Sequence, residues 1–228
     1  MGRTARVGFL RQVLYIVAKD FRAELRTKEL FNSMFLFALL ALVIFNFSFA
    51  GKMPVRILAG AMWVSFLFAS VLGLNRSFVK EHEKGSIEGL LVIPCDRSVI
   101  YFGKLLGNLL FIFLVEIVSL PLISVFFSRN EILQKPLQLS GILVLGSLAI
   151  SSVGTILSAI TVNTRTRELL LPILLFPLVL PVLIGAVEVT AYIFQPKGTI
   201  SQWIRLIAIY DIIFLLVPYL LFDYVVEE

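Results

Sequence analysis

The chain has 228 residues, of which 59% are hydrophobic and only 15% are charged, and its formal net charge is +5. Soluble domains carry about 45 to 50% apolar residues, so this composition excludes an ordinary soluble protein and indicates that lipid is part of the solvent. The basic residues flank apolar segments and form no continuous face, which favours a topology signal over a nucleic-acid partner. Cys95 is the only cysteine, which excludes a disulfide framework or a cysteine-based metal centre within one chain.

Residues 1–29 are predicted to form a cytoplasmic unit that remains on the mature protein, because they lack a compact apolar stretch that ends at a cleavage site. From residue 9 to residue 28, apolar side chains recur at helical spacing on one face, and charged side chains lie on the opposite face. This pattern predicts an amphipathic helix that lies in the membrane interface. The alternative is a helix packed on a cytoplasmic partner. The apolar face is Leu10, Val13, Leu14, Val17, Phe21 and Leu25, and the polar face is Arg11, Lys19, Asp20, Arg22 and Arg26.

Residues 30–228 are predicted to form one transmembrane domain. A spanning helix needs about 20 mostly apolar residues, and six segments meet that requirement. The fold class is therefore an all-α membrane protein with six transmembrane helices, an N-terminal interfacial helix and a cytoplasmic coupling helix between the second and third spans. The predicted spans are 30–49, 57–74, 102–127, 139–162, 169–189 and 203–224.

The distribution of Lys and Arg predicts the orientation, because cytoplasmic segments retain positive charge. Fourteen of the 20 Lys and Arg residues lie at or beside the N-terminal segment, the second connection and the fourth connection. The N-terminus is therefore expected in the cytoplasm. With six spans, the C-terminus is expected there too.

The second connection, residues 75–101, is the longest cytoplasmic loop. Gly85 interrupts a charged helix, and Ser86 can cap a short new helix that Pro94 ends. Apolar side chains surrounded by glutamates on a cytoplasmic segment indicate a contact with a partner protein. The alternative is a solvated loop that folds back on the bilayer. The residues expected to contact that partner are Glu81, Glu83, Gly85, Ser86, Ile87, Glu88, Leu90 and Leu91.

Three prolines recur in the fifth span. Pro172, Pro177 and Pro181 each remove a backbone donor and favour a kink, so this helix is expected to bend. The bend is either a hinge used in gating or a fixed packing shape.

Ionisable residues inside spans are candidates for function, because a charge at the bilayer centre costs at least about 2.5 kcal/mol on insertion scales. Glu116 and Asp211 lie within spans, and Glu188 is expected at the outer end of the fifth helix. If the first two face the interior, they could bind a cation, carry a proton or make structural hydrogen bonds. The expected hydrogen-bond partners are Asn108, Ser119 and Tyr210. Three such acids would suit an ion-coupled carrier, but we expect no basic partner within a span and find no internal repeat.

No catalytic motif is present in the sequence. The phosphate-binding pattern G-x-x-x-x-G-K-[ST] is missing, so the chain is not expected to hydrolyse ATP and is not predicted to be an enzyme. The only histidine, His82, stands between two glutamates, and neither it nor Cys95 has the setting of a haem ligand. We therefore expect no catalytic, metal or cofactor site on this chain alone.

The order of a basic helix, a hairpin, a long charged loop and four further helices resembles the permeases of ABC-2 type exporters. Within that group the chain is similar to the CcmB family, the cytochrome c maturation protein B or haem exporter protein B family. The stretches that carry this similarity are DFRAELRTKE at 20–29, EHEKGSIEGLL at 81–91 and RELLLPILLFPLVLPVLI at 167–184.

This resemblance implies a permease subunit in the bacterial inner membrane. It implies an ATPase partner like CcmA, which binds the ATP, membrane partners like CcmC and CcmD, and a periplasmic haem chaperone like CcmE. The complex would handle haem, and segment 81–91 would couple ATP hydrolysis to haem delivery or chaperone release. The alternatives are an exporter of a drug, lipid or polysaccharide, an ion-coupled carrier, and a scaffold that only anchors the ATPase.

Overall fold

In the computed structural model, the residues described are 8–50, 52–83, 97–128, 131–162, 164 and 166–225. Regular structure in these ranges is entirely helical, as the apolar segments predict. The helices are α1 (Phe9–Thr27), α2 (Glu29–Ser48), α3 (Val55–Glu83), α5 (Arg97–Phe126), α6 (Glu131–Gln134), α7 (Pro136–Thr161), α8 (Arg167–Phe194) and α9 (Ser201–Val225).

Six of these helices are long and apolar enough to cross a membrane, which confirms the predicted number of spans. They coincide with the predicted segments, but several helices continue beyond the apolar region. The span of α3 ends at Arg76, whereas the helix continues to Glu83. Charged residues such as Lys and Glu are good helix formers, so hydropathy alone finds the span and misses the extension.

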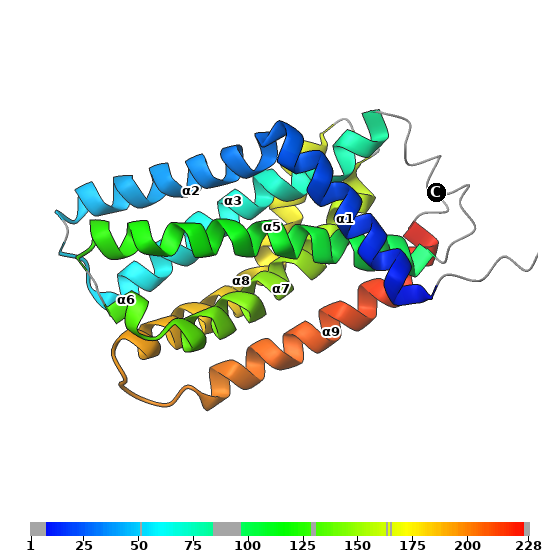
Figure 1. Cartoon of the computed structure of the whole chain (residues 1–228). Helices are drawn as coiled ribbons and strands as arrows, with labels where there is room; N and C mark the ends of the chain where they lie inside the picture. Colours follow the sequence, from blue (N-terminus) through cyan, green and yellow to red (C-terminus); the bar gives the residue numbers. More distant parts are fainter. Residues whose placement is uncertain are drawn as a thin grey trace, which may run out of the picture.

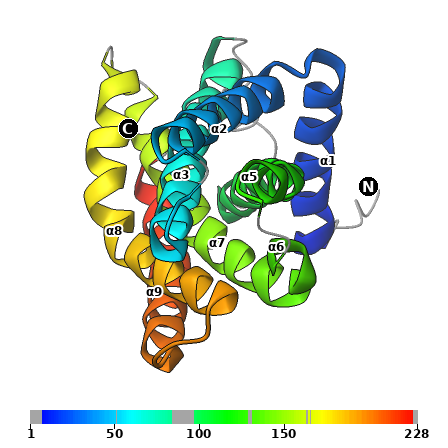
Figure 2. The same ribbon diagram turned by 90° about the vertical axis from the view of Figure 1, so that its left-hand side faces the viewer.

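The six spans form a bundle in which α3 and α7 are the central helices. Of their span residues, 72% and 78% are buried inside the molecule, against 22% in α2 and 17% in α9. Figure 2, viewed along the bundle, shows α3 and α7 between the outer helices. The two outer helices therefore present most of their surface to lipid.

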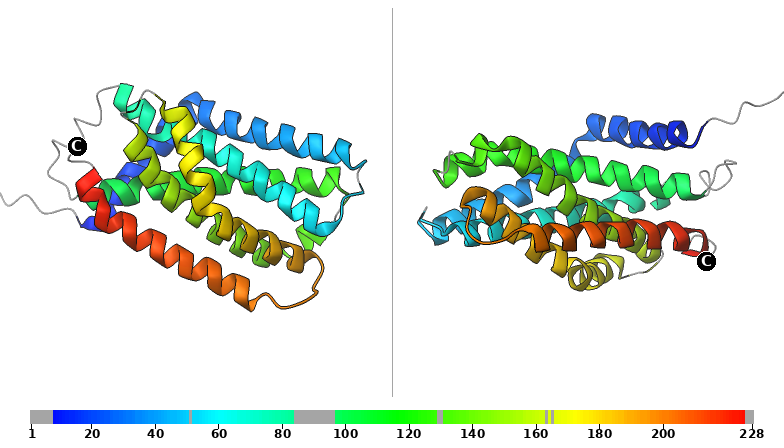
Figure 3. Two further views of the ribbon diagram at one scale, coloured as in Figure 1. Left: turned by 180° about the vertical axis from the view of Figure 1, so that it is seen from behind. Right: turned by 90° about the horizontal axis from the view of Figure 1, so that it is seen from below.

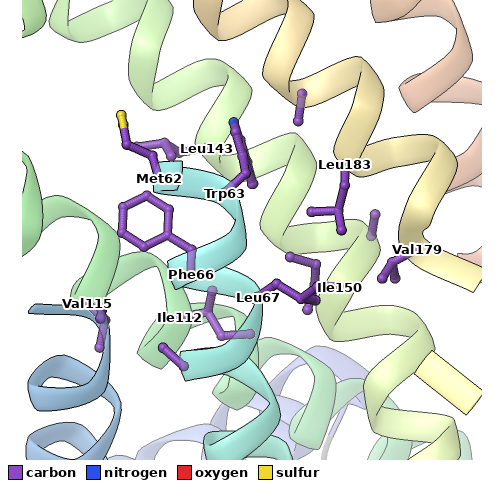
Figure 4. Packing of buried hydrophobic residues seen from close by; sticks show 14 of the residues in the cluster. Met62, Trp63, Phe66, Leu67, Ile112, Val115, Leu143, Ile150, Val179 and Leu183 are labelled. Carbon is purple, nitrogen blue, oxygen red and sulfur yellow. The ribbon is translucent and has the colours of Figure 1, made fainter. Parts of the chain in front are cut away.

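Small residues allow the central helices to approach closely. A Cβ added at Gly146 of α7 would lie 2.2 Å from the ring of Trp63 on α3, and one at Gly154 would lie 2.3 Å from Leu74. Figure 4 shows Trp63 among the buried side chains of α3, α7 and α8. Close approach at small residues is the usual basis of helix association in lipid, where the hydrophobic effect does not drive the helices together.

The two ends of the bundle differ in structure. At one end, which we call the α1 end, α1 crosses the direction of the spans, and α3, α7 and α9 finish there (Figures 1 and 2). At the other end, which we call the opposite end, lie the turn from α2 to α3, the short α6 and the connection from α8 to α9 (Figures 1 and 3). The α1 end is the side that the charge pattern predicts to be cytoplasmic.

Candidate functional site within the bundle and at its ends

Glu116 lies on α5 and is fully buried. The hydroxyl of Ser147 on α7 donates a hydrogen bond to its Oε2 at 2.7 Å, while Oε1 has no partner among the described residues. The sequence places Glu116 within a span without deciding which way it faces, and in the structure it faces the interior of the bundle. Its partner Ser147 was not predicted, and Asn108 and Ser119, which were, bond elsewhere: Asn108 to Thr155 and Ser119 to the carbonyl of Val115.

Asp211 lies on α9, and only 4% of its surface is exposed. Neither of its carboxyl oxygens has a hydrogen-bond partner within the described ranges. The neighbouring hydroxyl of Tyr210, a predicted partner, donates instead to the carbonyl of Leu178 at 2.6 Å. Among the described buried acids, Asp211 is therefore the one with neither carboxyl oxygen in a hydrogen bond.

A row of hydroxyl groups on α7 connects the central helix to its neighbours. Besides Ser147, the hydroxyl of Ser151 donates to the carbonyl of Leu105 at 2.8 Å, and that of Ser158 donates to the carbonyl of Leu74 at 3.1 Å. Asn108 of α5 donates to Thr155 of α7 at 3.0 Å. These bonds satisfy buried polar groups between helices and explain why a central span contains so many hydroxyls.

Glu188 lies on α8 near the opposite end, as the sequence predicts. It forms an ion pair with Arg56 in the first turn of α3, so the expectation that these acids have no basic partner within a span is wrong for this residue. The side chain of Arg56 is 74% exposed and that of Glu188 is 21% exposed. Nearby, the indole N–H of Trp63 donates to Thr190 at 2.9 Å, so α3 and α8 are held together by polar contacts at this end.

The three prolines of the fifth span lie inside α8, which continues through them. Figure 3 shows that the part of α8 nearest its start runs in a different direction from the rest, as the proline spacing predicts. Leu171, Leu175 and Val179 are fully buried within this stretch, so the bend is packed against the bundle. Whether Pro172, Pro177 and Pro181 also act as a gating hinge stays a prediction.

A second polar cluster, which the sequence analysis missed, joins α1 to α5. Lys104 of α5 is buried, with a side chain only 3% exposed, and its ammonium donates to Asp20 Oδ2 of α1 at 2.8 Å. Asp20 also pairs with Lys19 at 3.3 Å. Two features of the sequence could have indicated this pair. They are a lysine inside an apolar segment and a single acid on the basic face of α1. Lys104 is also a basic residue within a span, which the sequence analysis did not expect.

Glu24 holds the corner between α1 and α2. Lys28 between the helices has a left-handed backbone with φ of 54°, and the buried carboxylate of Glu24 accepts the backbone N–H groups of Leu30 and Phe31 at 2.6 and 3.0 Å. These donors belong to the first turn of α2, where they have no helical acceptor. Glu24 therefore caps the N-terminus of α2 from the preceding helix. Sequence motifs for helix caps span only three or four residues, so they do not reveal this role.

The predicted coupling residues lie at or beyond the end of α3. Glu81 and Glu83 belong to its last turn, and α5 begins at Arg97 at the same end of the bundle. The remaining residues predicted to couple to the ATPase lie outside the described residues, and they are Gly85, Ser86, Ile87, Glu88, Leu90 and Leu91.

No metal centre is evident in the part of the chain that the structure describes, where no three His, Cys, Asp or Glu side chains come close enough to hold an ion. The described buried polar side chains are carboxyls, hydroxyls, one amide and the ammonium of Lys104, and they act through hydrogen bonds and one ion pair. These bonds join the helices of the bundle, and within the described ranges they leave Asp211 and Oε1 of Glu116 without a hydrogen-bond partner.

Together these features define a multi-pass α-helical membrane protein with a crosswise helix at one end. The sequence model of the family described as "CcmB protein" matches residues 11–222. The chain therefore belongs to the CcmB family, as its three characteristic stretches predict.

Individual relatives agree with this assignment. The chain is 30% identical to "Heme exporter protein B" of Rhodobacter capsulatus over 76% of this chain and 79% of that protein. It is 33% identical to the protein of the same name from Pseudomonas aeruginosa over 55% of each chain. It is 29% identical to that of Haemophilus influenzae over 77% of this chain and 80% of the relative.

Proposed function

We propose that this chain is the membrane permease subunit of a haem exporter complex that acts in cytochrome c biogenesis. Its membership of the CcmB family and the names of its relatives support the class of cargo. In this proposal residues 1–29 form the cytoplasmic unit and residues 30–228 the transmembrane domain, in a bacterial inner membrane with both termini in the cytoplasm. A partner ATPase, two haem-handling membrane subunits and a periplasmic haem chaperone, like CcmA, CcmC, CcmD and CcmE, complete the system.

The observation that carries the mechanism is the course of α3. This helix runs without a break from Arg56 at the opposite end to Glu83 at the α1 end. Because a continuous helix transmits displacement along its axis, movement of the segment after Glu83 would reach the Arg56–Glu188 contact. We infer that nucleotide-driven closure of the ATPase moves residues 85–94, and that α3 and α5 carry this motion across the membrane. A coupling of this kind requires the segment to contact the open and closed ATPase differently.

The output of that motion would be haem delivery or release of the haem-loaded chaperone. ATP would be bound by the partner, because the chain has no phosphate-binding motif. Haem would be bound by other subunits of the complex, because His82 and Cys95 lack the sequence setting of haem ligands. The work of this chain is then mechanical and shared with its partners.

Variants of the predicted coupling segment test this proposal. Gly85→Pro, or Leu90→Asp combined with Leu91→Asp, should lower the yield of c-type cytochromes while the protein still reaches the membrane. ATP hydrolysis by the complex should become independent of cytochrome assembly. Gln195→Asp is the control, because Gln195 is exposed in the connection from α8 to α9 at the opposite end of the bundle. Normal cytochrome levels in the segment variants would exclude the coupling role and favour a passive scaffold.

One observation favours a second function. The carboxyl of Asp211 is buried without a partner among the described residues, as an ion-carrying group in a secondary carrier would be. Purified protein in liposomes would then move solute on a pH gradient without any ATPase, and Asp211→Asn would abolish that transport. A complex that works with Asp211→Asn would exclude this function.

A further inference from the structure

The surface of α1 that faces away from α5 carries two parallel rows of side chains. The outer apolar row is Leu10, Leu14 and Leu25, which are 75%, 62% and 56% exposed. The outer basic row is Arg11, Lys19, Arg22 and Arg26, all of them exposed. A helix with adjacent apolar and basic strips has the pattern of a segment that lies on a membrane surface.

The orientation of these rows is fixed by the other side of α1. Val13 is 3% exposed against the bundle, and Asp20 is bound to the buried Lys104. A Cβ added at Gly103 of α5 would lie 2.7 Å from Ile16 Cγ2, so α1 and α5 are in close contact at this point. The Glu24 cap fixes the end of α1 to α2. These contacts hold α1 with its outer rows facing away from the protein.

In the outer basic row Lys19 pairs with Asp20, while the two arginines nearest the end of α1 keep their positive charge unneutralised among the described residues. Within the part of the chain that the structure describes, Arg22 and Arg26 form no ion pair. The two acids of α1 are already engaged, Asp20 by Lys104 and Glu24 by the start of α2. Between the basic side chains lies a shallow groove of about 670 Å³, whose lining includes the whole outer basic row together with Leu14 and Tyr15.

We propose that the outer face of α1 binds anionic phospholipids, with the outer basic row on the phosphodiester groups and the outer apolar row against the upper acyl chains. Guanidinium groups suit phosphate because they donate planar, paired hydrogen bonds. Figures 1 and 2 show α1 crossing the direction of the spans at their end, a course that would lie at the depth of the headgroups in a bilayer.

Charge alone would equally suit an acidic protein surface. An acidic protein would match the basic row but would leave three exposed leucines without an apolar partner, whereas a bilayer surface satisfies both rows together. The proposal involves neither the ATPase nor the cargo, and it stands whether or not the chain exports haem.

The test uses the whole protein, purified and placed in lipid nanodiscs that contain phosphatidylcholine and phosphatidylglycerol in a known ratio. Lipids retained by the protein are counted by native mass spectrometry after release from the disc. The wild type should retain phosphatidylglycerol over phosphatidylcholine by about tenfold relative to their ratio in the disc, because each basic residue near an anionic surface contributes to this attraction. Arg22→Glu combined with Arg26→Glu should reduce that preference to near unity.

A matched control makes the same change in net charge at the opposite end. Lys52 and Lys197 are exposed there, and Lys52→Glu combined with Lys197→Glu should leave the lipid preference unchanged. Arg22→Lys with Arg26→Lys keeps the charge and should retain most of the preference. If the double reversal does not fold, Arg22→Gln with Arg26→Gln removes the charge more gently and should still lower the preference several-fold.

Three outcomes would overturn the proposal. The first is a wild type without preference for phosphatidylglycerol. The second is an equal loss in the variants at the two ends, which would mean that only net charge matters. The third is unchanged lipid retention with loss of a co-purifying partner subunit in the α1 variants, which would assign this face to an acidic protein.

Discussion

The two ends of the bundle are both held by ion pairs, but in different surroundings. At the α1 end, Lys104 is 3% exposed and its partner Asp20 is 19% exposed. At the opposite end, Arg56 is 74% exposed and its partner is Glu188. A buried pair is costly to break, because one charge is left without water or a partner, whereas an exposed pair exchanges its contact for water at little cost.

This difference suggests how the molecule divides its work. Contacts at the α1 end bind α1, α2 and α5 into one unit. At the opposite end, the exposed Arg56–Glu188 ion pair between α3 and α8 can open at low cost, whereas the buried hydrogen bond from Trp63 is expected to stay closed. A motion that starts at the cytoplasmic connection would then have its output at the opposite end, which the charge pattern predicts to face the periplasm.

The largest expected effect concerns the centre that joins the two ends. Gly146→Leu would force a side chain into the ring of Trp63, where even a Cβ would lie at 2.2 Å. We expect a loss of about 3 kcal/mol or more of folding stability, since overpacking a close helix contact forces the backbones apart. Thermal unfolding in detergent measures this loss. Gly141→Leu is the control on the same helix, because no atom lies within 4 Å of a Cβ at that position.

The next effect compares the two ion pairs directly. Asp20→Asn should cost about 2 to 3 kcal/mol, because it removes the negative charge that lies 2.8 Å from the buried ammonium of Lys104. Glu188→Gln should cost under about 1 kcal/mol, because Arg56 remains solvated. Unfolding of both variants is followed under identical conditions. Equal costs at the two ends would contradict the division between a fixed and an opening end.

Removal of the Glu24 cap tests whether the α1 end is a single unit. Glu24→Ala should cost about 1 to 2 kcal/mol, the usual range for a lost helix cap. Hydrogen exchange should accelerate at the amides of Leu30 and Phe31, because both donate hydrogen bonds to the carboxylate of Glu24. Glu168→Ala, an exposed acid in the first turn of α8, serves as the comparison. Unchanged exchange at those two amides would show that the corner is held by other contacts.

The smallest effect is expected inside the bundle. Ser147→Ala removes the hydrogen bond to Glu116 and should cost about 0.6 kcal/mol, the average for such bonds in membrane bundles. Ser140→Ala, at a partly exposed residue whose hydroxyl bonds only to its own helix, should cost less. A cost above about 2 kcal/mol for Ser147→Ala would mean that Glu116 depends on this bond more than the described contacts indicate.

Much of the fold could be predicted from the sequence because its strongest signals are local. Each span shows itself as an apolar run of sufficient length, and the periodicity of residues 9–28 predicts α1. The proline spacing similarly predicts the bend in α8. The family could also be predicted, because each of the three characteristic stretches is a continuous run of residues.

The polar contacts of the site could not be predicted in the same way. Glu116 and Ser147 are 31 residues apart, and Asp20 and Lys104 are 84 apart, so only the packing of the helices brings them together. The sequence located Glu116 and Asp211 within spans, but the hydrogen-bond partners that it offered for them bond elsewhere. The roles of Lys104 and Glu24 were not predicted. A single charged residue near the end of a span is usually interpreted as a topology signal, and only the folded structure reveals the group that it contacts.

The most direct test of the central claim measures whether nucleotide moves the opposite end. Ile57 of α3 and Ile184 of α8 are exposed to lipid, and spin labels at these positions, in a chain with Cys95→Ser, report the distance between the two helices. In the assembled complex, the distance should differ between the nucleotide-free and ATP-bound ATPase, and Gly85→Pro should abolish the difference. An unchanged distance in a complex that still hydrolyses ATP and supports cytochrome c assembly would contradict the account.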